Sequence, residues 1–260
     1  MSPHIHSTAI VHPSARVPQS CTIGPFCIVG EDVEMGEHCE LLSHVVMGGP
    51  TTIGSNNRVF PFTTLGLEPQ DLKFKGEKTR LEIGNNNVIR ESVTIHRGTP
   101  AGGGLTHVGS NCLIMAYTHI AHDCHIADNV IMANAATLAG HVTVEEYAVV
   151  GALCPVHQFV RIGAYSYIGG GTTITQDVLP FSLTSAKRDV HAFGMNSVGL
   201  QRKGFSKERL RKIHAAYRLI LSSKMNIGEA LAKVKGDGDL GNDVERLVKF
   251  VEGSERGILK

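Results

Sequence analysis

The sequence lacks any long apolar run: no stretch of its 260 residues approaches the roughly 18 apolar residues that a membrane span requires. It also lacks a basic start followed by an apolar segment, since it opens with MSPHIHSTAIVHPS, so no secretory signal is expected. The chain also lacks a strong net charge, since its formal charge is +1. Its content of 42% hydrophobic and 19% charged residues is typical of a folded globular protein. These features predict a cytoplasmic protein without stable membrane insertion.

The small net charge hides an uneven distribution along the chain. Residues 1–180 carry 9 Lys and Arg against 15 Asp and Glu, whereas residues 181–260 carry 16 against 9. A basic segment suits a nucleic acid, a phosphorylated ligand or an acidic protein partner, although a solvated surface is the commoner explanation. The two parts of the chain are therefore expected to play different roles.

An aliphatic residue recurs at every sixth position through most of the first 180 residues. The runs extend from Ile5 to Leu65, from Ile83 to Ile95 and from Val108 to Ile174, and glycine often follows the aliphatic residue. A helix would rotate successive members of this series by about 240°, which scatters them over three sides. Short strands joined by tight turns suit the period, because each aliphatic side chain points inward and three hexads close one triangular coil.

This repeat resembles that of the hexapeptide-repeat acyltransferases, which implies an all-β, left-handed parallel β-helix over residues 1–180. The handedness rests on the resemblance, because ordinary crossovers are right-handed. The cysteines fit the same register, since each falls four residues after a repeat aliphatic, where other hexads have Ala, Val or Thr. They are Cys21, Cys27, Cys39, Cys112, Cys124 and Cys154. They are predicted to fill the interior, so neither disulfides nor a metal cluster are expected.

Two interruptions of the repeat predict loops that project from the coils. The first, near residues 66–82, has the polar Asp71 and Glu77 where aliphatic residues belong. The second, near residues 97–107, lengthens the interval between repeat aliphatics to thirteen residues and contains the glycine-rich HRGTPAGGGLTH. Loops on a rigid scaffold are favoured places for binding groups.

The repeat stops after Pro180, and residues 181–260 are predicted to form a small C-terminal α-helical domain. Ser206 is suited to cap a helix whose apolar side runs from Leu210 to Leu221, and apolar stripes at 230–234 and 244–251 predict two more helices. This domain is expected to cover the open strand edge of the last coil.

Five of the fourteen histidines lie between residues 119 and 157. His119, His122 and His125 stand three apart in YTHIAHDCHI, but on extended segments this spacing does not bring them together within one coil. The coil period brings histidines of successive coils together instead. His141 lies one coil plus one residue after His122, and His157 lies about two coils after it. One edge of the prism is therefore predicted to gather histidines.

These histidines have three explanations. They are exposed polar turn residues, or zinc ligands as in the hexapeptide carbonic anhydrases, or they include a general base. The sequence singles out no set of three ligands, so no metal is expected. A histidine base is favoured, because imidazole titrates near neutrality and Asp123 or a backbone carbonyl is placed to orient it.

A more specific resemblance rests on five segments. They are ESVTIHRGT at 91–99, HIAHDC at 119–124, TLAGHV at 137–142, VHQF at 156–159 and RKGFS at 202–206. These motifs resemble those of the UDP-N-acetylglucosamine O-acyltransferase family, which acts first in lipid A biosynthesis. The likeness extends over nearly the whole chain.

The resemblance implies transfer of an (R)-3-hydroxyacyl chain from acyl carrier protein to the 3-position of UDP-N-acetylglucosamine, without a cofactor or a covalent enzyme intermediate. His122 is the implied base, with Asp123 beside it, and the Gly140 amide is the implied oxyanion donor. The implied substrate-binding residues are Asp71, Lys73, His119, His141, His157, Gln158, Asn196 and Arg202.

Met115 and Gly170 are implied to line the acyl-chain groove. Glycine at position 170 leaves the groove open, so a longer chain is expected than a methionine there would admit. Val198 stands where the family is expected to have an acidic residue, which leaves the ribose contacts open. The acyl length and the choice between a 3-hydroxy and a 3-amino sugar also stay open.

The family further implies a homotrimer with its active sites between subunits. Basic residues of the tail are expected to meet the acidic carrier protein and the pyrophosphate, and no nucleic-acid partner is expected. They are Lys187, Arg188, Arg202, Lys203, Lys207, Arg209, Arg211 and Lys212.

Two other functions compete with this one. The later N-acyltransferase of the same pathway would carry a separate N-terminal domain before the coils, whereas here the repeat begins at Ile5. A non-enzymatic or ice-binding β-solenoid would present a regular threonine array, and the clustered histidines and irregular loops argue against it.

Overall fold

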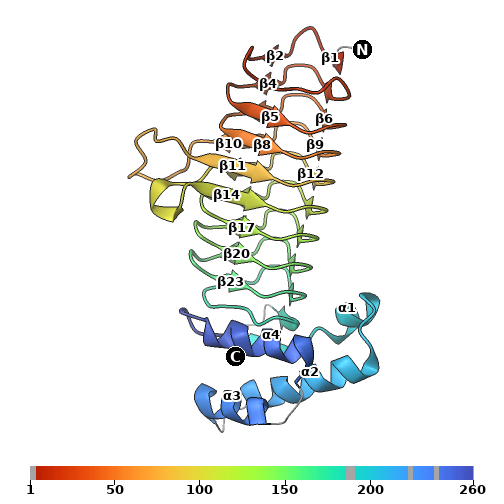
Figure 1. The fold of residues 1–260 in the computed structure, drawn as a ribbon, viewed down its shortest axis with the longest axis vertical. Coiled ribbons are helices and arrows are strands. Elements are labelled where there is room, and N and C mark those ends of the chain that lie inside the picture. Colours follow the sequence, from red (N-terminus) through yellow and green to blue (C-terminus); the bar gives the residue numbers. More distant parts are fainter. Residues whose placement is uncertain (1–3, 186–190, 222–224, 237–239, 260) are drawn as a thin grey trace.

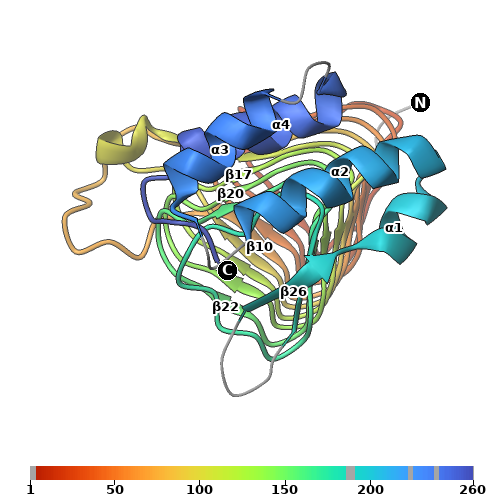
Figure 2. The same ribbon diagram turned by 90° about the horizontal axis from the view of Figure 1, so that it is seen from below.

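The computed structural model describes residues 4–185, 191–221, 225–236 and 240–259. Most of the chain winds into a triangular prism of stacked coils, and helices close its C-terminal end (Figures 1 and 2). This is the left-handed parallel β-helix that the repeat and the family resemblance predicted, followed by the helical region predicted after Pro180.

Three sheets form the sides of the prism, with parallel pairing throughout the coils. Sheet A contains β1 (His4–Ile5), β3 (Thr22–Ile23), β6 (Glu40–Leu41), β9 (Arg58–Val59), β12 (Val88–Ile89), β15 (Leu113–Ile114), β18 (Ile131–Met132), β21 (Val149–Val150), β24 (Tyr167–Ile168), β25 (Ser182–Ser185) and β26 (His191–Met195). Sheet B contains β2 (Ile10–Val11), β4 (Ile28–Val29), β7 (Val46–Met47), β10 (Thr64–Leu67), β13 (Thr94–His96), β16 (His119–Ile120), β19 (Thr137–Leu138) and β22 (Pro155–Val156). Sheet C contains β5 (Val33–Met35), β8 (Thr51–Ile53), β11 (Arg80–Ile83), β14 (Leu105–Val108), β17 (His125–Ile126), β20 (Thr143–Val144) and β23 (Arg161–Ile162).

The repeat aliphatics face the interior. Ile114, Ile120 and Ile126 come from the three sides of one coil, and none of them has any exposed surface. The six cysteines are buried and unpaired, as their register predicted. Cys124, for example, donates from Sγ to the carbonyl oxygen of Ala139 at 3.2 Å, so it also satisfies a backbone group in the next coil.

The chain turns at three corners, named here A–B, B–C and C–A after the sheets that they join. Corner residues adopt left-handed backbone angles, and those one coil apart lie above one another: Asp123 (φ 60°), His141 (φ 64°) and Phe159 (φ 64°) mark the B–C corner. A left-handed residue allows the sharp turn that two-residue strands need, and it stacks side chains along each edge.

Two excursions leave the B–C corner. Leu81 in β11 pairs with Thr51, 30 positions earlier, and the intervening chain between β10 and β11 projects as a long loop. The second excursion lies between β13 and β14 and contains a 3₁₀ helix, η1 (Pro100–Gly102). Both extend to the same side of the prism in Figure 1. The sequence predicted both loops from its breaks in period.

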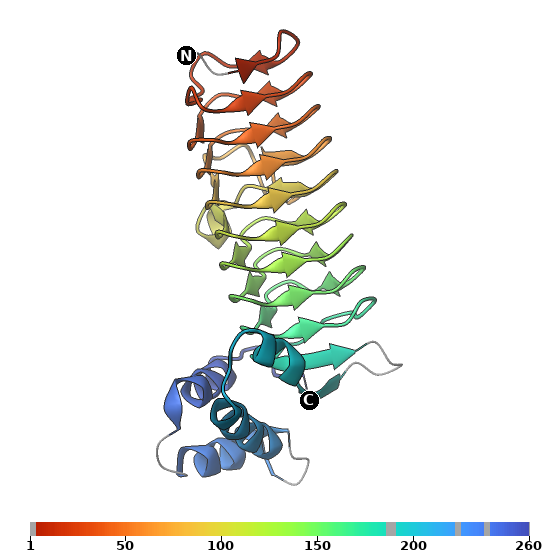
Figure 3. The same cartoon turned by 90° about the vertical axis from the view of Figure 1, so that its right-hand side faces the viewer.

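In the part of the chain that the structure describes, four α-helices close the C-terminal end (Figure 3). They are α1 (Ser197–Arg202), α2 (Lys207–Ile220), α3 (Ile227–Gly236) and α4 (Gly241–Glu252). Ser206 caps α2 by accepting a hydrogen bond from the Arg209 amide at 3.3 Å, as predicted. Leu179 and Phe181 belong to the core of these helices, which joins the helical region to the last coil. Among the described residues, no helix has both the length and the apolarity of a membrane span.

Sheet A continues beyond the coils. β24 pairs in parallel with β25, and β25 pairs in antiparallel fashion with β26. The edge of the last coil strand, β24, is therefore covered by β25. The domain boundary at residue 180 stays a prediction, since strand pairing in sheet A runs past it.

Candidate active site

Two successive residues at the B–C corner form a histidine–carboxylate pair. The His122 imidazole donates from Nδ1 to the Oδ2 of Asp123 at 2.7 Å. The Asp123 side chain is 1% exposed and that of His122 is 15% exposed, so the carboxylate lies behind the ring. In the neutral imidazole, donation from Nδ1 leaves Nε2 of His122 without a proton, which is the tautomer that a general base requires.

The second excursion encloses the Asp123 carboxylate. Thr99 donates its backbone N–H to Oδ1 at 2.7 Å and its hydroxyl to Oδ2 at 2.6 Å. The Asp123 amide in turn donates to the Thr106 hydroxyl at 2.8 Å. A Cβ on Gly102 would lie only 2.0 Å from the carboxylate carbon, so glycine is needed for this close approach. Three donors on one buried carboxylate suit its ionised form, which only accepts hydrogen bonds.

The next coil places Gly140 and His141 against the same ring. A Cβ on Gly140 would lie 2.6 Å from Cε1 and 2.9 Å from Nε2 of His122, so the Gly140 backbone adjoins the base nitrogen. Among the described residues, no acceptor takes the Gly140 N–H, which is therefore available to a bound group. The His141 ring meets that of His122 edge to face, with centroids 5.2 Å apart, and stacks on Phe159 at 4.4 Å.

Neighbouring imidazoles are held neutral by burial. Burial, with smaller contributions from His119, His122 and Arg97, lowers the pKa of His96 to about 4. Burial also lowers the pKa of His119 and that of His141, where the Asp123 carboxylate opposes part of the effect. Neutral rings offer both a donor and an acceptor to polar substrate groups.

The other sequence-predicted residues near this corner surround the pair. His119 lies half-buried on β16 and shares a 2.6 Å hydrogen bond between its Nδ1 and the Thr94 hydroxyl. His157 and Gln158 lie exposed one coil beyond Ala139 and Gly140. Asp71, on the first excursion, is close enough to His141 to act electrostatically on its imidazole. The Lys73 amide donates to the Asp71 carboxylate at 2.9 Å, while the Lys73 side chain is exposed.

Asn196 and Arg202 lie elsewhere, beside the C–A corner. They line a groove of 520 Å³ whose other walls include Tyr147, Tyr165 and the exposed Val198. The Asn196 side chain caps α1 by accepting from the Gly199 amide at 3.1 Å. Figure 2 shows α1 and the two excursions at different corners of the triangle, so a single chain does not bring these residues to His122.

The two expected groove residues, Met115 and Gly170, both lie at the A–B corner. Met115 follows β15 and is half-buried, whereas Gly170 follows β24 in a later coil. A Cβ on Gly170 would lie 3.3 Å from the carbonyl oxygen of Ala152 and would otherwise meet open space. Gly170 thus lies at the surface, and any larger side chain at this position would project from it.

One group of possible metal ligands exists among the described residues. His122, Asp123 and His141 each offer one ligand atom, and these atoms lie within 4.8 Å of one another. Every one of them belongs to the His122–Asp123 pair or to the coil packed on it. Ligand geometry alone therefore does not distinguish a base from a metal site here.

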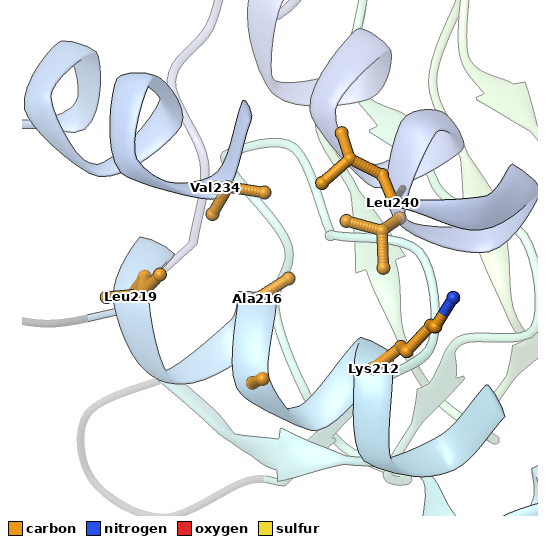
Figure 4. A pocket seen from close by; sticks show the side chains of 7 residues that line it. Lys212, Ala216, Leu219, Val234 and Leu240 are labelled. Atoms are coloured by element: carbon orange, nitrogen blue, oxygen red, sulfur yellow. The ribbon is translucent and has the colours of Figure 1, made fainter. Parts of the chain in front are cut away.

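A separate concavity of 160 Å³ lies within the helical region (Figure 4). Its labelled side chains are Lys212, Ala216, Leu219, Val234 and Leu240. Its lining includes Lys212 of the basic tail but no acid, imidazole or thiol. It has no part in the chemistry of the B–C corner.

Sequence reasoning missed Thr99, the residue that binds both oxygens of Asp123. A local signal existed in TPAG, because Thr99 is the N-cap of η1 and Pro100 is its first residue. That signal predicts a capped turn at Thr99, but it does not predict that Thr99 would contact Asp123 in the next coil.

Comparison with known proteins gives consistent results. A profile described as "Udp N-acetylglucosamine O-acyltransferase; Domain 2" matches residues 177–259, and one for bacterial transferase hexapeptide repeats matches residues 105–140. An acyl-[acyl-carrier-protein]–UDP-N-acetylglucosamine O-acyltransferase of Myxococcus xanthus is 44% identical over 256 residues, covering 98% of this chain and 99% of that protein.

Solved structures agree over the same length. The UDP-N-acetylglucosamine acyltransferase of Francisella novicida superposes with a TM-score of 0.95 at 39% identity, covering 98% of this chain and 93% of that one. The UDP-N-acetylglucosamine O-acyltransferase of Moraxella catarrhalis gives a TM-score of 0.95 at 40% identity, covering 99% of this chain and 100% of that one.

Proposed function

This chain belongs to the UDP-N-acetylglucosamine O-acyltransferase family, and we propose that His122 is the general base with which it acylates the sugar. The enzyme transfers an acyl chain from acyl carrier protein to UDP-N-acetylglucosamine, the first step of lipid A biosynthesis. The observation that supports the base is the 2.7 Å bond from His122 Nδ1 to the enclosed carboxylate of Asp123.

The proposed reaction begins at Nε2 of His122, which takes the proton of the sugar 3-hydroxyl. The sugar oxygen then attacks the thioester carbonyl carbon of the (R)-3-hydroxyacyl group, and the positive charge on His122 faces the Asp123 carboxylate. The Gly140 N–H donates to the resulting oxyanion. When the tetrahedral intermediate collapses, the carrier thiolate leaves and recovers the proton from His122. No covalent bond to the enzyme forms, and no cofactor takes part.

Substrate contacts follow from the placement of the remaining residues. His119, His141, His157 and Gln158 surround the base and are proposed to hold the sugar and the pantetheine arm. Asp71 and Lys73 approach from the first excursion. A groove that begins between Met115 and Gly170 at the A–B corner is proposed to take the acyl chain, and the open surface at Gly170 favours a long one.

The nucleotide is proposed to bind in the C–A groove, where Arg202 is suited to bidentate contact with phosphate. Val198 lies exposed on the wall of this groove and carries no carboxylate, so position 198 offers the ribose no acidic partner. Because this groove and His122 lie at different corners, one complete site needs two chains. A homotrimer is therefore part of the proposal.

The exposed apolar surface supports one arrangement of the trimer. Phe26, Phe62, Tyr117 and Leu153 all project from the A–B corner and are 55 to 68% exposed. Large apolar side chains that recur along one exposed edge are typical of a protein contact. Three prisms packed around their A–B corners would bring the B–C corner of one subunit against the C–A corner of the next, which joins His122 to Arg202 of a neighbour.

Acyl carrier protein is proposed to approach over the helical region. Arg202, Lys203, Lys207 and Arg211 are exposed there, which gives an acidic partner a basic surface. Arg209 differs, because its guanidinium makes two hydrogen bonds of 2.7 and 2.8 Å to the Asp243 carboxylate. Lys187 and Arg188, which were also expected to contribute, lie outside the described residues.

The direct test is a transfer assay with UDP-N-acetylglucosamine and a panel of 3-hydroxyacyl carrier proteins. We expect wild-type transfer to favour one acyl length, and His122→Ala to lose almost all of it while sedimentation still shows the trimer. An intact trimer in which His122→Ala retains near-normal turnover would falsify the assigned base. Parallel assays with the 3-amino analogue of UDP-N-acetylglucosamine determine whether the enzyme acylates a 3-hydroxyl or a 3-amino group.

A further inference from the structure

The Asp123 carboxylate is a buried anion without a permanent counter-ion. Its side chain is 1% exposed, and among the described residues its only charge partners within 4 Å are the imidazoles of His122 and His141. Buried charges in proteins are normally paired or bound to a cation. Imidazoles supply hydrogen bonds to this carboxylate but no permanent positive charge, so it retains an attraction for cations.

The three side chains are arranged so that one small ion would meet them all. Oδ2 of Asp123 lies 2.7 Å from Nδ1 of His122 and 3.7 Å from Nε2 of His141. Zinc binds nitrogen and oxygen ligands at about 2.0–2.2 Å, so ligands of a tetrahedral site lie roughly 3.3 Å apart. The first distance must lengthen by about 0.6 Å and the second shorten by about 0.4 Å to reach that value. All three ligand atoms lie within 4.8 Å of one another. The His122 and His141 side chains are 15% and 22% exposed, so both rings reach the surface of the corner.

We propose that His122, Asp123 and His141 form an inhibitory site for divalent transition ions, of which Zn²⁺ fits best. The ion takes the place of the proton that Nδ1 of His122 shares with Asp123. Histidine nitrogen and carboxylate oxygen are the donors that Zn²⁺ prefers, and a solvent molecule or substrate oxygen completes the coordination. Metal binding itself does not depend on the proposed function; its effect on transfer does.

The consequence for catalysis is a change of tautomer. A neutral imidazole can bind metal through Nδ1 only if its single proton moves to Nε2. No proton is lost in this step, but Nε2 now carries the hydrogen and has no lone pair for the sugar hydroxyl. The metal therefore removes the base while the corner keeps its shape. Inhibition is expected in kcat more than in KM.

A second histidine pair supplies a matched control. His107 and His125 are Cα partners on β14 and β17 of sheet C, and their side chains face outward from the coil. The Cα partner of His107 on the other side is Glu82, whose carboxylate binds Arg80 at 2.6 Å. This pair has two imidazoles but no enclosed carboxylate, so it lacks the feature on which the proposal rests.

The test uses the full-length protein without a histidine tag, with Co²⁺ as a spectroscopic probe. We expect the wild type and the double variant His107→Ala/His125→Ala to bind one tight Co²⁺ per chain with four-coordinate absorption. Asp123→Asn and His141→Ala should bind it at least tenfold more weakly, with thermal unfolding used to confirm that both fold. Unchanged binding in these two, loss confined to the double variant, or no tight site in the wild type would overturn the proposal.

Transfer assays then separate the metal site from the assigned base. Zn²⁺ is expected to lower kcat at least tenfold in the wild type and in the double variant, and EDTA should restore it. If Co²⁺ and Zn²⁺ bind these three residues but transfer continues at full rate, the metal site stands and the role of His122 as base fails. If His122→Ala abolishes transfer and no metal binds, the base stands and the metal site fails.

Discussion

Thr99 holds Asp123 by both carboxylate oxygens, through its backbone N–H at 2.7 Å and its hydroxyl at 2.6 Å. The two residues come from successive coils, and Thr99 itself caps the short helix of the second excursion. A carboxylate held at both oxygens has one orientation, and it therefore fixes the ring of His122. The excursion is thus a support for the base as well as an interruption of the repeat.

Thr99→Val tests this support. The variant keeps the backbone bond to Oδ1 but loses the hydroxyl bond to Oδ2, which should cost about 1–2 kcal/mol of transition-state stabilisation. We expect kcat to fall about tenfold with little change in KM. Thr99→Ser should restore most of the activity, because it returns the hydroxyl. Equal losses in both variants would show that packing of the methyl group, and not the hydrogen bond, is what matters.

Gly140→Ala tests the space beside the base. The added Cβ would lie 2.6 Å from Cε1 of His122, so the ring or the backbone must move. A displacement near 1 Å costs on the order of 100-fold in rate, and that is the expected drop in kcat. Gly236→Ala is the control, since its Cβ would meet nothing within 4 Å. Wild-type kinetics in Gly140→Ala would mean that the ring has more room than its neighbours indicate.

His96 makes stability depend on pH. Its folded-state pKa of about 4 lies below the ordinary value of 6.5, so the unfolded chain binds its proton first as the pH falls. Stability is therefore complete above pH 6.5 and is lost between pH 6.5 and 4. Linkage gives a loss of about 2 kcal/mol by pH 5 from this residue.

The measurement compares denaturant unfolding of the wild type and of His96→Phe at pH 7.5 and pH 5.0, at one protein concentration. The wild type should lose more free energy of unfolding over that interval than the variant, by about 2 kcal/mol. The contribution of His141, which does not involve His96, cancels between the two proteins, whereas that of His119, whose ring centroid lies 5.1 Å from that of His96, is part of the measured difference. Identical pH dependence would assign the acid sensitivity to histidines other than His96.

Removal of metal should leave the enzyme active. The proposed mechanism draws its base from His122 and its oxyanion donor from Gly140, with no step that needs an ion. We expect dialysis against EDTA to leave kcat unchanged or slightly raised, the rise reflecting release of trace zinc from the site proposed above. A loss of activity that only one added metal reverses would replace the base with a metal centre.

The fold was predictable because one constraint repeats. Each hexad places an aliphatic residue inside, and Ile114, Ile120 and Ile126 are accordingly fully buried. The same register identified the cysteines as interior, and their burial confirms it. The capped helix after Ser206 followed from local signals. In each case, residues within a few positions of one another in the sequence determine the local structure.

Features that depend on distant segments were harder to predict. The short helix α1 has too few residues for an apolar period, and the antiparallel pairing of β25 with β26 follows no repeat. The contact of Thr99 with Asp123 needs the exact path of a glycine-rich excursion, which sequence does not reveal. The separation of Arg202 from His122 within one chain was likewise visible only from the positions of the corners.

The proposal that one active site is shared by two subunits has a direct test in hybrid trimers. His122→Ala and Arg202→Ala chains, each nearly inactive alone, are co-expressed with different affinity tags, and mixed trimers are isolated. If His122 acts with Arg202 of a neighbouring subunit, each isolated mixed trimer regains one intact site of its three, or about a third of the sites, and activity reappears. If both residues serve one site within a single chain, every site keeps a defect and the mixed trimers stay inactive, which would contradict the account.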